Sequence, residues 1–380
     1  MSYLRLILSL ALGLALLGIA MVVLALVMGH MLPYIGDLAY ISTRDGTNKL
    51  YLMDLQRENS VRLSKTVVND CCLTWSPDGQ TLTTILDVSS DGSTDIYGLS
   101  MNSGIERLTN AQGADLYPSY SADGQRIVFT SYRGDVPKIF IMDADGSNQH
   151  ALTTQSLANV NPHPVWSSDG QSVVLTDFNN VNSLFTIPAN CPDPCSDNTQ
   201  MTIHANDRSL MTTSFVLVDQ TRMFMAAFDR RLKSGGYGMY TLDINSPNEP
   251  ERLTVNANFE PPSVAVNGRW VAFVSGNVDP AQPLNKGNNL FILDGNCIGS
   301  TAGCATSVQE IASQIRTDDN LAWSPDGHWL VYVANLNGMP HLYLLDATCV
   351  QQHEDCTRYI HALPDTPARY VRPVWRPHMP

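Results

Sequence analysis

The eight cysteines are the side chains of this sequence with the most distinctive chemistry. Six of them form three pairs that are close in sequence: Cys191 with Cys195, Cys297 with Cys304, and Cys349 with Cys356. Such spacing suits a disulfide, part of a zinc site or a redox pair. We favour disulfides, because zinc needs four converging ligands and these pairs lie far apart in the chain. Each bridge would contribute about 2 kcal/mol and indicates an oxidising compartment.

The adjacent Cys71 and Cys72 are a separate case. Neighbouring cysteines form either a vicinal disulfide or two half-buried thiols, and a ligand or redox contact is the more specific alternative. Cys72 and His163 hold equivalent positions in two of the repeats described below, so a metal site with soft and imidazole ligands is a further hypothesis. We nevertheless expect no resident metal and no cofactor.

Four other side chains could carry catalysis: His163 as acid, Glu260 or Asp319 as base, and Arg372 as an anion clamp. No nucleophile elbow, H-E-x-x-H helix, P-loop or dinucleotide fingerprint accompanies them. We therefore assign no catalytic residue and expect a protein without catalytic activity. An enzyme of the hydrolase or lyase type is the alternative.

A repeat positions these residues. The block LTWSPDGQ (73–80) returns as PSYSADGQ (118–125), PVWSSDGQ (164–171) and LAWSPDGH (321–328), with weaker or truncated copies at 214–221, 262–269 and 373–377. Their anchor residues are Trp75, Tyr120, Trp166, Val216, Val264, Trp323 and Trp375. Each unit also carries one Tyr/Phe block, such as KLYLMDL (49–55) or HLYLLDA (341–347). Both blocks therefore occur seven times.

Each unit is predicted to form four short strands. Asp-Gly supplies the positive φ of a tight turn after the anchor strand, and the Tyr/Phe block alternates like a half-buried strand. A recurring Asp after that block, as at Asp54 and Asp346, is interpreted as a turn residue. Four-stranded units of about 40–50 residues indicate a β-propeller. We predict an all-β, seven-bladed propeller, with six blades as the alternative, closed by a C-terminal strand that completes the first blade.

The W-S-P-D-G-Q strand followed by an I-Y-x-M-D strand resembles the TolB-like, WD-type propeller repeats of bacterial envelope proteins. The resemblance covers residues 37–380 and is strongest in the units that start near residues 73, 118, 164 and 321. It implies the fold rather than a chemistry. Many such relatives are binding platforms, and some are the propeller halves of peptidases.

In a propeller the inner strands start around the central channel, so residues three to five before each anchor are candidates for its mouth. The resulting ligand- or partner-binding set is Asp70, Cys72, Tyr117, His163, Glu260, Asp319 and Arg372. Asp115 and Tyr370, five before their anchors, belong to the same alignment. Concave faces with a few converging polar groups are common binding sites. The alternative is a set of ordinary solvated strand ends.

The N-terminus predicts a membrane anchor. Residues 6–29 carry no charge, and a helix of that length spans ~36 Å, enough to cross a ~30 Å hydrocarbon core. A cleaved signal peptide is the alternative. Arg5 precedes the apolar run and Arg44 is the next basic residue after it, which places the N-terminus inside. The predicted organisation is an anchor (1–30), a short linker (31–36) and a propeller (37–380).

The formal net charge of -13 argues against nucleic acid as a partner. We expect a single-pass protein of the cytoplasmic membrane with an extracytoplasmic propeller that acts as a protein- or ligand-binding scaffold. Its partners would be other envelope or membrane proteins, and a small-molecule ligand is compatible with the predicted mouth. A second alternative is an accessory subunit of a membrane complex, with residues 6–29 packed on partner helices.

Overall fold

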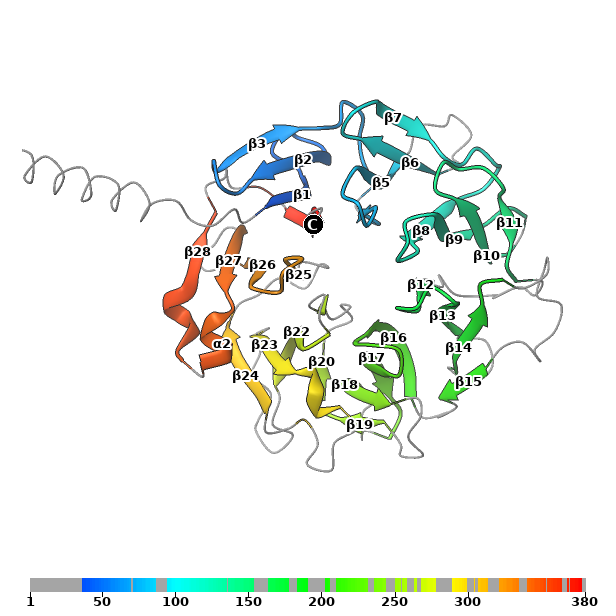
Figure 1. Ribbon diagram of the computed structural model, residues 1–380. Coiled ribbons are helices and arrows are strands. Elements are labelled where there is room, and N and C mark those ends of the chain that lie inside the picture. Colours follow the sequence, from blue (N-terminus) through cyan, green and yellow to red (C-terminus); the bar gives the residue numbers. More distant parts are fainter. Residues whose placement is uncertain are drawn as a thin grey trace, which may run out of the picture.

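Seven antiparallel sheets form a ring, as the sequence predicted (Figure 1). The computed structural model describes residues 36–69, 71–86, 94–134, 136–153, 163–177, 183–190, 202–205, 210–231, 236–243, 250–253, 255–257, 263–264, 268–277, 289–298, 304, 307–313, 321–334, 340–352, 354–363, 368 and 370–377. The six-bladed alternative is wrong, because the weak unit near residue 216 forms a complete sheet.

We number the sheets as blades 1 to 7 in chain order. The innermost strands are β29 (Tyr370–Trp375), β4 (Thr74–Trp75), β8 (Asp115–Tyr120), β12 (Val165–Trp166), β16 (Leu210–Leu217), β20 (Val255–Ala257) with β21 (Ser263–Val264), and β25 (Leu321–Trp323). The second strands are β1 (Asp37–Ser42), β5 (Thr81–Leu86), β9 (Arg126–Ser131), β13 (Ser172–Asp177), β17 (Arg222–Asp229), β22 (Trp270–Asn277) and β26 (Trp329–Ala334).

The outer half of each blade follows the same order. The third strands are β2 (Lys49–Asp54), β6 (Asp95–Ser100), β10 (Lys138–Asp143), β14 (Ser183–Pro188), β18 (Gly236–Asp243), β23 (Asn289–Asp294) and β27 (His341–Asp346). The outermost strands are β3 (Asn59–Arg62), β7 (Gly104–Arg107), β11 (His150–Ala151), β15 (Thr202–Ala205), β19 (Glu251–Arg252), β24 (Val308–Ala312) and β28 (Ile360–Ala362).

The apolar core of the ring lies between the blades. Seven clusters of buried side chains occur among the described residues, and each joins two neighbouring blades. Anchor tryptophans also connect neighbours: Trp166 Nε1 of blade 4 donates to the Ser119 carbonyl of blade 3 at 2.9 Å. Trp375 of blade 1 makes the same bond to Ala322 of blade 7. Each blade therefore depends on both of its neighbours for burial.

Blade 1 closes the ring with strands from the two ends of the propeller. β29 pairs antiparallel with β1, Trp375 opposite Leu38 and Tyr370 opposite Ser42, which confirms the predicted closure. The Arg44 guanidinium carbon lies 4.3 Å from the Tyr51 ring centroid and 5.9 Å from that of Tyr370. One cation thus contacts rings from β2 and β29, which favours the closed blade.

We expect Arg44→Ala to lower the free energy of unfolding by about 1–2 kcal/mol, because a partly desolvated cation–π contact is lost at the closing blade. Urea unfolding monitored by tryptophan fluorescence measures the change. Arg57→Ala is the control: the Arg57 side chain is 78% exposed beside Asp54, so its loss should cost under about 0.5 kcal/mol. Equal effects of the two substitutions would show that Arg44 does not hold the closure.

The Ser-x-Asp-Gly segments close the turns between first and second strands. In blade 3 the Ser121 hydroxyl donates to Asp123 Oδ1 at 2.6 Å, and that oxygen accepts the Gln125 backbone N–H at 3.0 Å. Gly124 has a φ of 70°, the conformation predicted for the Asp-Gly turn. The same bonds recur at Ser76/Asp78, Ser167/Asp169 and Ser324/Asp326.

These turns should make the stability of the fold depend on pH. The Ser121 hydroxyl and then the Gln125 N–H lower the pKa of Asp123 below its ordinary value of 3.8. Ionised Asp123 therefore stabilises the fold above about pH 4, and this contribution disappears as the pH falls through the lowered pKa. In thermal unfolding between pH 2 and 7, the melting temperatures of wild type and Asp123→Asn should differ most at neutral pH and converge in acid. A constant gap would contradict this mechanism.

The recurring Asp after the third strand is a turn residue, as predicted. Asp54 Oδ1 accepts the backbone N–H of Gln56, Asp294 Oδ1 that of Asn296, and Asp346 Oδ1 that of Thr348, each at 3.0 Å. Each carboxylate therefore satisfies backbone donors of its own blade.

No helix in the described part of the chain is long and apolar enough to cross a membrane. The predicted anchor, residues 6–29, lies outside the described residues.

Candidate functional site

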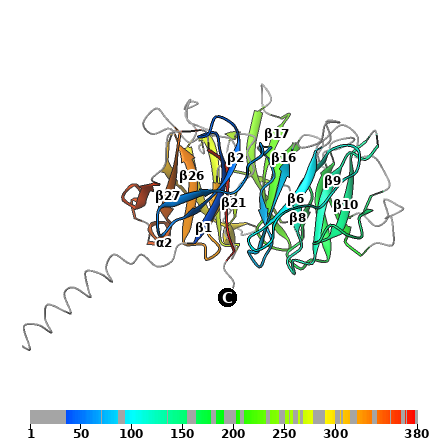
Figure 2. The same ribbon diagram turned by 90° about the horizontal axis from the view of Figure 1, so that it is seen from above.

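The antiparallel topology gives the ring two faces. Turns from first to second strand and from third to fourth lie on one face, which we call the turn face. All innermost strands begin at the other, which we call the start face. The last described residues leave at the turn face, where Arg376 Nε donates to the Gly79 carbonyl at 2.7 Å (Figure 2). The predicted binding residues therefore belong to the start face.

The position three before the anchor is the site of a repeated β-bulge. Tyr117 and Pro118 of β8 together face Phe129 of β9. Arg372 and Pro373 of β29 face Tyr40 of β1 in the same way. The register of β16 shifts at Thr213, the equivalent residue of blade 5. Bulges bend a strand and change the direction of its side chains.

The backbone is left-handed at this position in three blades. φ is 71° at Cys72, 56° at Tyr117 and 55° at Arg372, none of them glycine. In blade 2 the irregularity is larger: Val68 pairs with Leu86, and the next pair on this side is Thr74 with Thr83. A conformation that costs about 1–3 kcal/mol for such residues occurs mostly at functional sites.

Two predicted site residues from neighbouring blades are in contact. The Tyr117 and His163 ring centroids lie 3.6 Å apart, with planes inclined by 34°. His163 is exposed and Tyr117 half-buried. The pKa of Tyr132 is raised by burial and then by the Tyr117 phenol. An aromatic cluster therefore spans blades 3 and 4 at the start face.

Of the two alternatives for Cys71 and Cys72, a vicinal disulfide or two half-buried thiols, the structure has the vicinal disulfide. Both residues are half-buried and pack against the apolar cluster between blades 2 and 3, together with Leu116 and Tyr120. Because its sulfur is bonded to Cys71, Cys72 offers no thiolate, and the metal hypothesis for Cys72 with His163 is wrong for this state. Within the described ranges, no group of three His, Cys, Asp or Glu side chains could hold a metal ion.

Arg372 is half-buried in blade 1, at the position equivalent to Cys72 and Tyr117. Asp70, Glu260 and Asp319 lie outside the described residues. The structure thus brings together Tyr117 with His163. Because Glu260 and Asp319 are not described, it does not test the set of His163, Glu260, Asp319 and Arg372 named for the enzyme alternative.

We predicted that Asp115 and Tyr370, five positions before their anchor residues, line the mouth of the channel. This prediction is wrong for both residues. Asp115 and Tyr370 are fully buried. Asp115 Oδ2 accepts from Arg133 Nη2 at 3.0 Å, and Tyr370 lies near Arg44. The reason is the neighbouring arginine, which covers this position in each of the two blades.

Sequence reasoning missed these arginines. Arg44 and Arg133 each come four residues after a second-strand aromatic, Tyr40 or Phe129. The Arg133 guanidinium carbon lies 4.8 Å from the Phe140 ring centroid and 5.5 Å from that of Phe129. The recurrence of Arg at one offset in ISTR (41–44) and TSYR (130–133) was the available signal.

A second ion pair lies beside the first, between blades 2 and 3. Arg107 Nη2 donates to Asp95 Oδ2 at 2.5 Å. Burial raises the pKa of Asp95 against the opposing effect of Arg107, and the charge of Asp115 adds to the rise. Asp115 Oδ1 is buried without a hydrogen-bond partner. The two carboxylates therefore depend on their arginines for compensation.

We expect Asp115→Asn to lower the free energy of unfolding by about 3 kcal/mol, since Arg133 would keep a partly buried, unpaired charge. Arg133→Met combined with Asp115→Asn should cost less than the sum of the single changes. Glu106→Gln, on the exposed strand β7, is the control and should stay within about 0.5 kcal/mol of wild type. Denaturant titration supplies all four values, and an Asp115→Asn protein as stable as the control would contradict the structural role.

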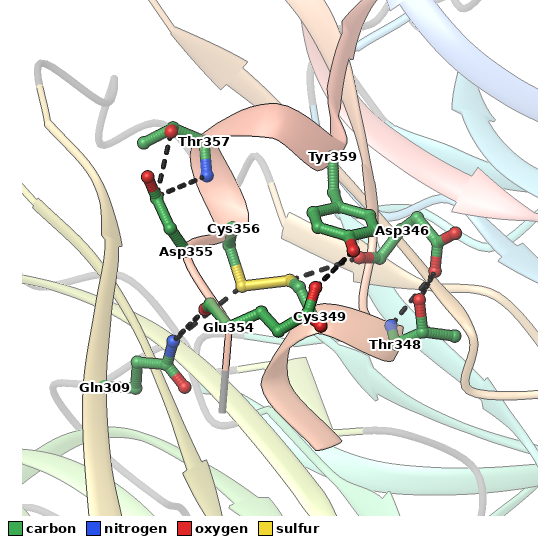
Figure 3. Close-up of a disulfide and its surroundings, with 9 residues drawn as sticks. All are labelled: Gln309, Asp346, Thr348, Cys349, Glu354, Asp355, Cys356, Thr357 and Tyr359. Atoms are coloured by element: carbon green, nitrogen blue, oxygen red, sulfur yellow. Dashed lines mark hydrogen bonds between the residues drawn. A yellow bond between two sulfur atoms is a disulfide. The ribbon is translucent and has the colours of Figure 1, made fainter. Parts of the chain in front are cut away.

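Two of the three predicted short-range disulfides are formed, Cys297–Cys304 and Cys349–Cys356, and we call them the staples. Cys191 and Cys195 lie outside the described residues. Both staples follow the third strand and reach the preceding blade. Gln309 of β24 donates to the Glu354 carbonyl at 3.3 Å beside Cys349–Cys356 (Figure 3), and the Cys304 N–H donates to Glu251 of β19 at 3.3 Å. These bridges therefore belong to the outer rim, away from the start-face cluster.

Comparison with known proteins shows what this ring is similar to. Residues 33–209 match the family model of the TolB beta propeller domain. A TolB homolog of Chlorobium luteolum is 33% identical over 105 residues, which are 27% of this chain and 22% of that protein. The matched stretch covers only 22 to 34% of the length of the curated relatives, so the activity of a whole relative does not transfer directly.

Two solved structures share the architecture. TolB from Acinetobacter baumannii has a TM-score of 0.54 at 17% identity, covering 90% of this chain and 67% of its own. Oligogalacturonate lyase from Vibrio parahaemolyticus has a TM-score of 0.61 at 12% identity, covering 82% and 86% respectively. At such identities the likeness concerns the fold alone.

Proposed function

We propose that this chain is a TolB-type β-propeller that acts as a binding scaffold without catalytic activity, and that its start face holds another envelope or membrane protein. The match of residues 33–209 to the TolB beta propeller domain supports the first part. The uncharged run of residues 6–29 supports a single-pass anchor in the cytoplasmic membrane with the propeller outside. The disulfides of blades 2, 6 and 7 support an oxidising, extracytoplasmic compartment.

The contact between Tyr117 and His163 is the observation that carries this proposal. It presents an aromatic surface at the start face, and its Tyr117 lies at the left-handed position of the bulged strand β8. Tyrosine is enriched among residues that dominate protein–protein affinity. The similarity of residues 33–209 to the TolB beta propeller domain supports the same reading. The net charge of -13 disfavours nucleic acid as the partner.

Two alternative functions are also proposed. In the first, His163 serves as the acid of a hydrolase or lyase, with Glu260 or Asp319 as base and Arg372 as anion clamp. In the second, the protein is an accessory subunit whose residues 6–29 pack on partner helices. The accessory-subunit alternative places its decisive contacts at residues 6–29, so residue-specific cross-linking separates it from a start-face scaffold. The enzyme alternative uses the same face as the scaffold, so a measurement of substrate turnover separates these two.

Position 163 offers a direct test against a matched control in the same blade. A photo-cross-linking amino acid replaces His163 at the start face or Gln171 at the turn face in the full, membrane-extracted chain; both residues are exposed. A partner at the start face predicts a discrete protein adduct from position 163 and none from position 171. Equal labelling, labelling only from position 171, or adducts formed only through residues 6–29 would contradict the proposal.

Tyr117→Ala should then weaken recovery of the cross-linked partner about tenfold, the effect of losing roughly 1.4 kcal/mol of an aromatic contact. Gln171→Ala should leave recovery unchanged. Quantitative affinity capture measures both, with thermal unfolding to verify that each variant is folded. Unchanged recovery by a folded Tyr117→Ala protein would refute the binding role, and substrate turnover that His163→Ala abolishes would favour the enzyme.

A further inference from the structure

The three described disulfides differ in accessibility and in what they join. Cys304 and Cys349 are fully buried and Cys356 is 3% exposed, whereas Cys71 and Cys72 are both partly exposed at the start face. We propose that Cys71–Cys72 is a thiol–disulfide exchange site, which accepts two electrons from an incoming dithiol and returns them to a disulfide oxidant. This inference goes beyond the binding function and does not depend on it.

The exposure of Cys71 and Cys72 and the surroundings of the departing sulfur favour thiol–disulfide exchange at this pair. Exchange requires a thiolate to reach one sulfur and the other sulfur to depart as a thiolate. Attack on the partly exposed Cys297 would release the Cys304 thiolate into the apolar cluster between blades 5 and 6, where burial opposes the charge. Attack on either Cys71 or Cys72 releases the thiolate of a residue that is itself partly exposed. The vicinal bridge is therefore the chemically competent one.

The backbone around the pair does not depend on the bridge. Cys72 has a φ of 71°, yet Tyr117 and Arg372 hold φ of 56° and 55° at the equivalent position without any disulfide. The propeller bulge itself thus imposes the left-handed conformation. Reduction should leave the strand in place with the two sulfurs adjacent, ready to close again.

Reduction should also leave the fold stable. A disulfide stabilises chiefly by restricting the unfolded chain, and the effect grows with the length of the closed loop. Cys297–Cys304 and Cys349–Cys356 each join residues seven apart, whereas Cys71–Cys72 joins adjacent residues. The vicinal bridge contributes little by this mechanism, so its opening and closing can proceed in the folded ring.

The exchange balances in electrons and protons. One thiolate of the dithiol attacks Sγ of Cys71 or Cys72, the bond between the two sulfurs breaks, and the released thiolate takes up a proton. The second thiol of the reductant attacks the mixed disulfide and releases the other cysteine. The products are two cysteine thiols and the disulfide of the reductant, and the reverse sequence restores the bridge.

Graded reduction of the full chain in detergent tests the proposal. Dithiothreitol is added stepwise at neutral pH, thiols are trapped with N-ethylmaleimide, and mass spectrometry quantifies each cysteine peptide. We expect Cys71 and Cys72 to be labelled at a reductant concentration at least tenfold below that which opens Cys349–Cys356, with a melting temperature changed by less than about 2 °C. Simultaneous or later opening, or a fall in melting temperature on selective opening, would overturn the proposal.

Variants and a second reductant sharpen the result. Cys71→Ser with Cys72→Ser should abolish the low-concentration step, whereas Cys349→Ser with Cys356→Ser should retain it. A folded protein dithiol of the C-x-x-C type replaces dithiothreitol in a parallel arm. Reduction in both arms supports the site and assigns it a protein dithiol, and reduction by dithiothreitol alone supports a small dithiol. Labelling of Cys71 and Cys72 before any reductant is added would refute the bridge itself.

Discussion

Pairing of β29 with β1 is the interaction on which the rest of this molecule depends. The ring has no central core; its buried side chains lie in the interfaces between neighbouring blades. If β29 leaves β1, blade 1 loses its inner strand, with Trp375 and Tyr370, and both neighbouring interfaces lose burial. A sheet edge also opens, which invites pairing with other chains. Closure therefore sets the stability of every blade.

The closure also fixes the start face. β29 carries Arg372 at the bulged position that Tyr117 holds in β8, and both bulges lie opposite a second-strand aromatic. In blades 1 and 3 an arginine covers the aromatic pair formed by the second and third strands, at Tyr40/Tyr51 and Phe129/Phe140. In each blade the same arginine also contacts the residue five positions before the anchor residue. In each of these two blades, one arginine therefore connects the innermost strand to the second and third strands.

Sequence reasoning reached the blade count, the strand order and the closure, because these follow from turn chemistry and from strands that alternate with period 2. It could not foresee the burial of Asp115. An alignment of the repeats shows where a residue lies in its blade. It does not show the direction of a side chain near Tyr117, because the chain is left-handed there and the bulge interrupts the alternation of side chains along the strand. Arg133 lies eighteen residues from Asp115 in the chain, and only the folded sheet brings the two together.

Three neighbouring blades carry the features that could do chemistry and that the structure describes at the start face. Among the residues that the structure describes, the vicinal disulfide, Tyr117 and His163 occupy blades 2, 3 and 4 in succession. The staples of blades 6 and 7 instead fasten the outer rim to the preceding blade. Solved structures of TolB and of an oligogalacturonate lyase share this architecture, so the fold does not decide between binding and catalysis. A partner that engages one arc of the ring needs neighbouring side chains on adjacent blades, and blades 2 to 4 provide them.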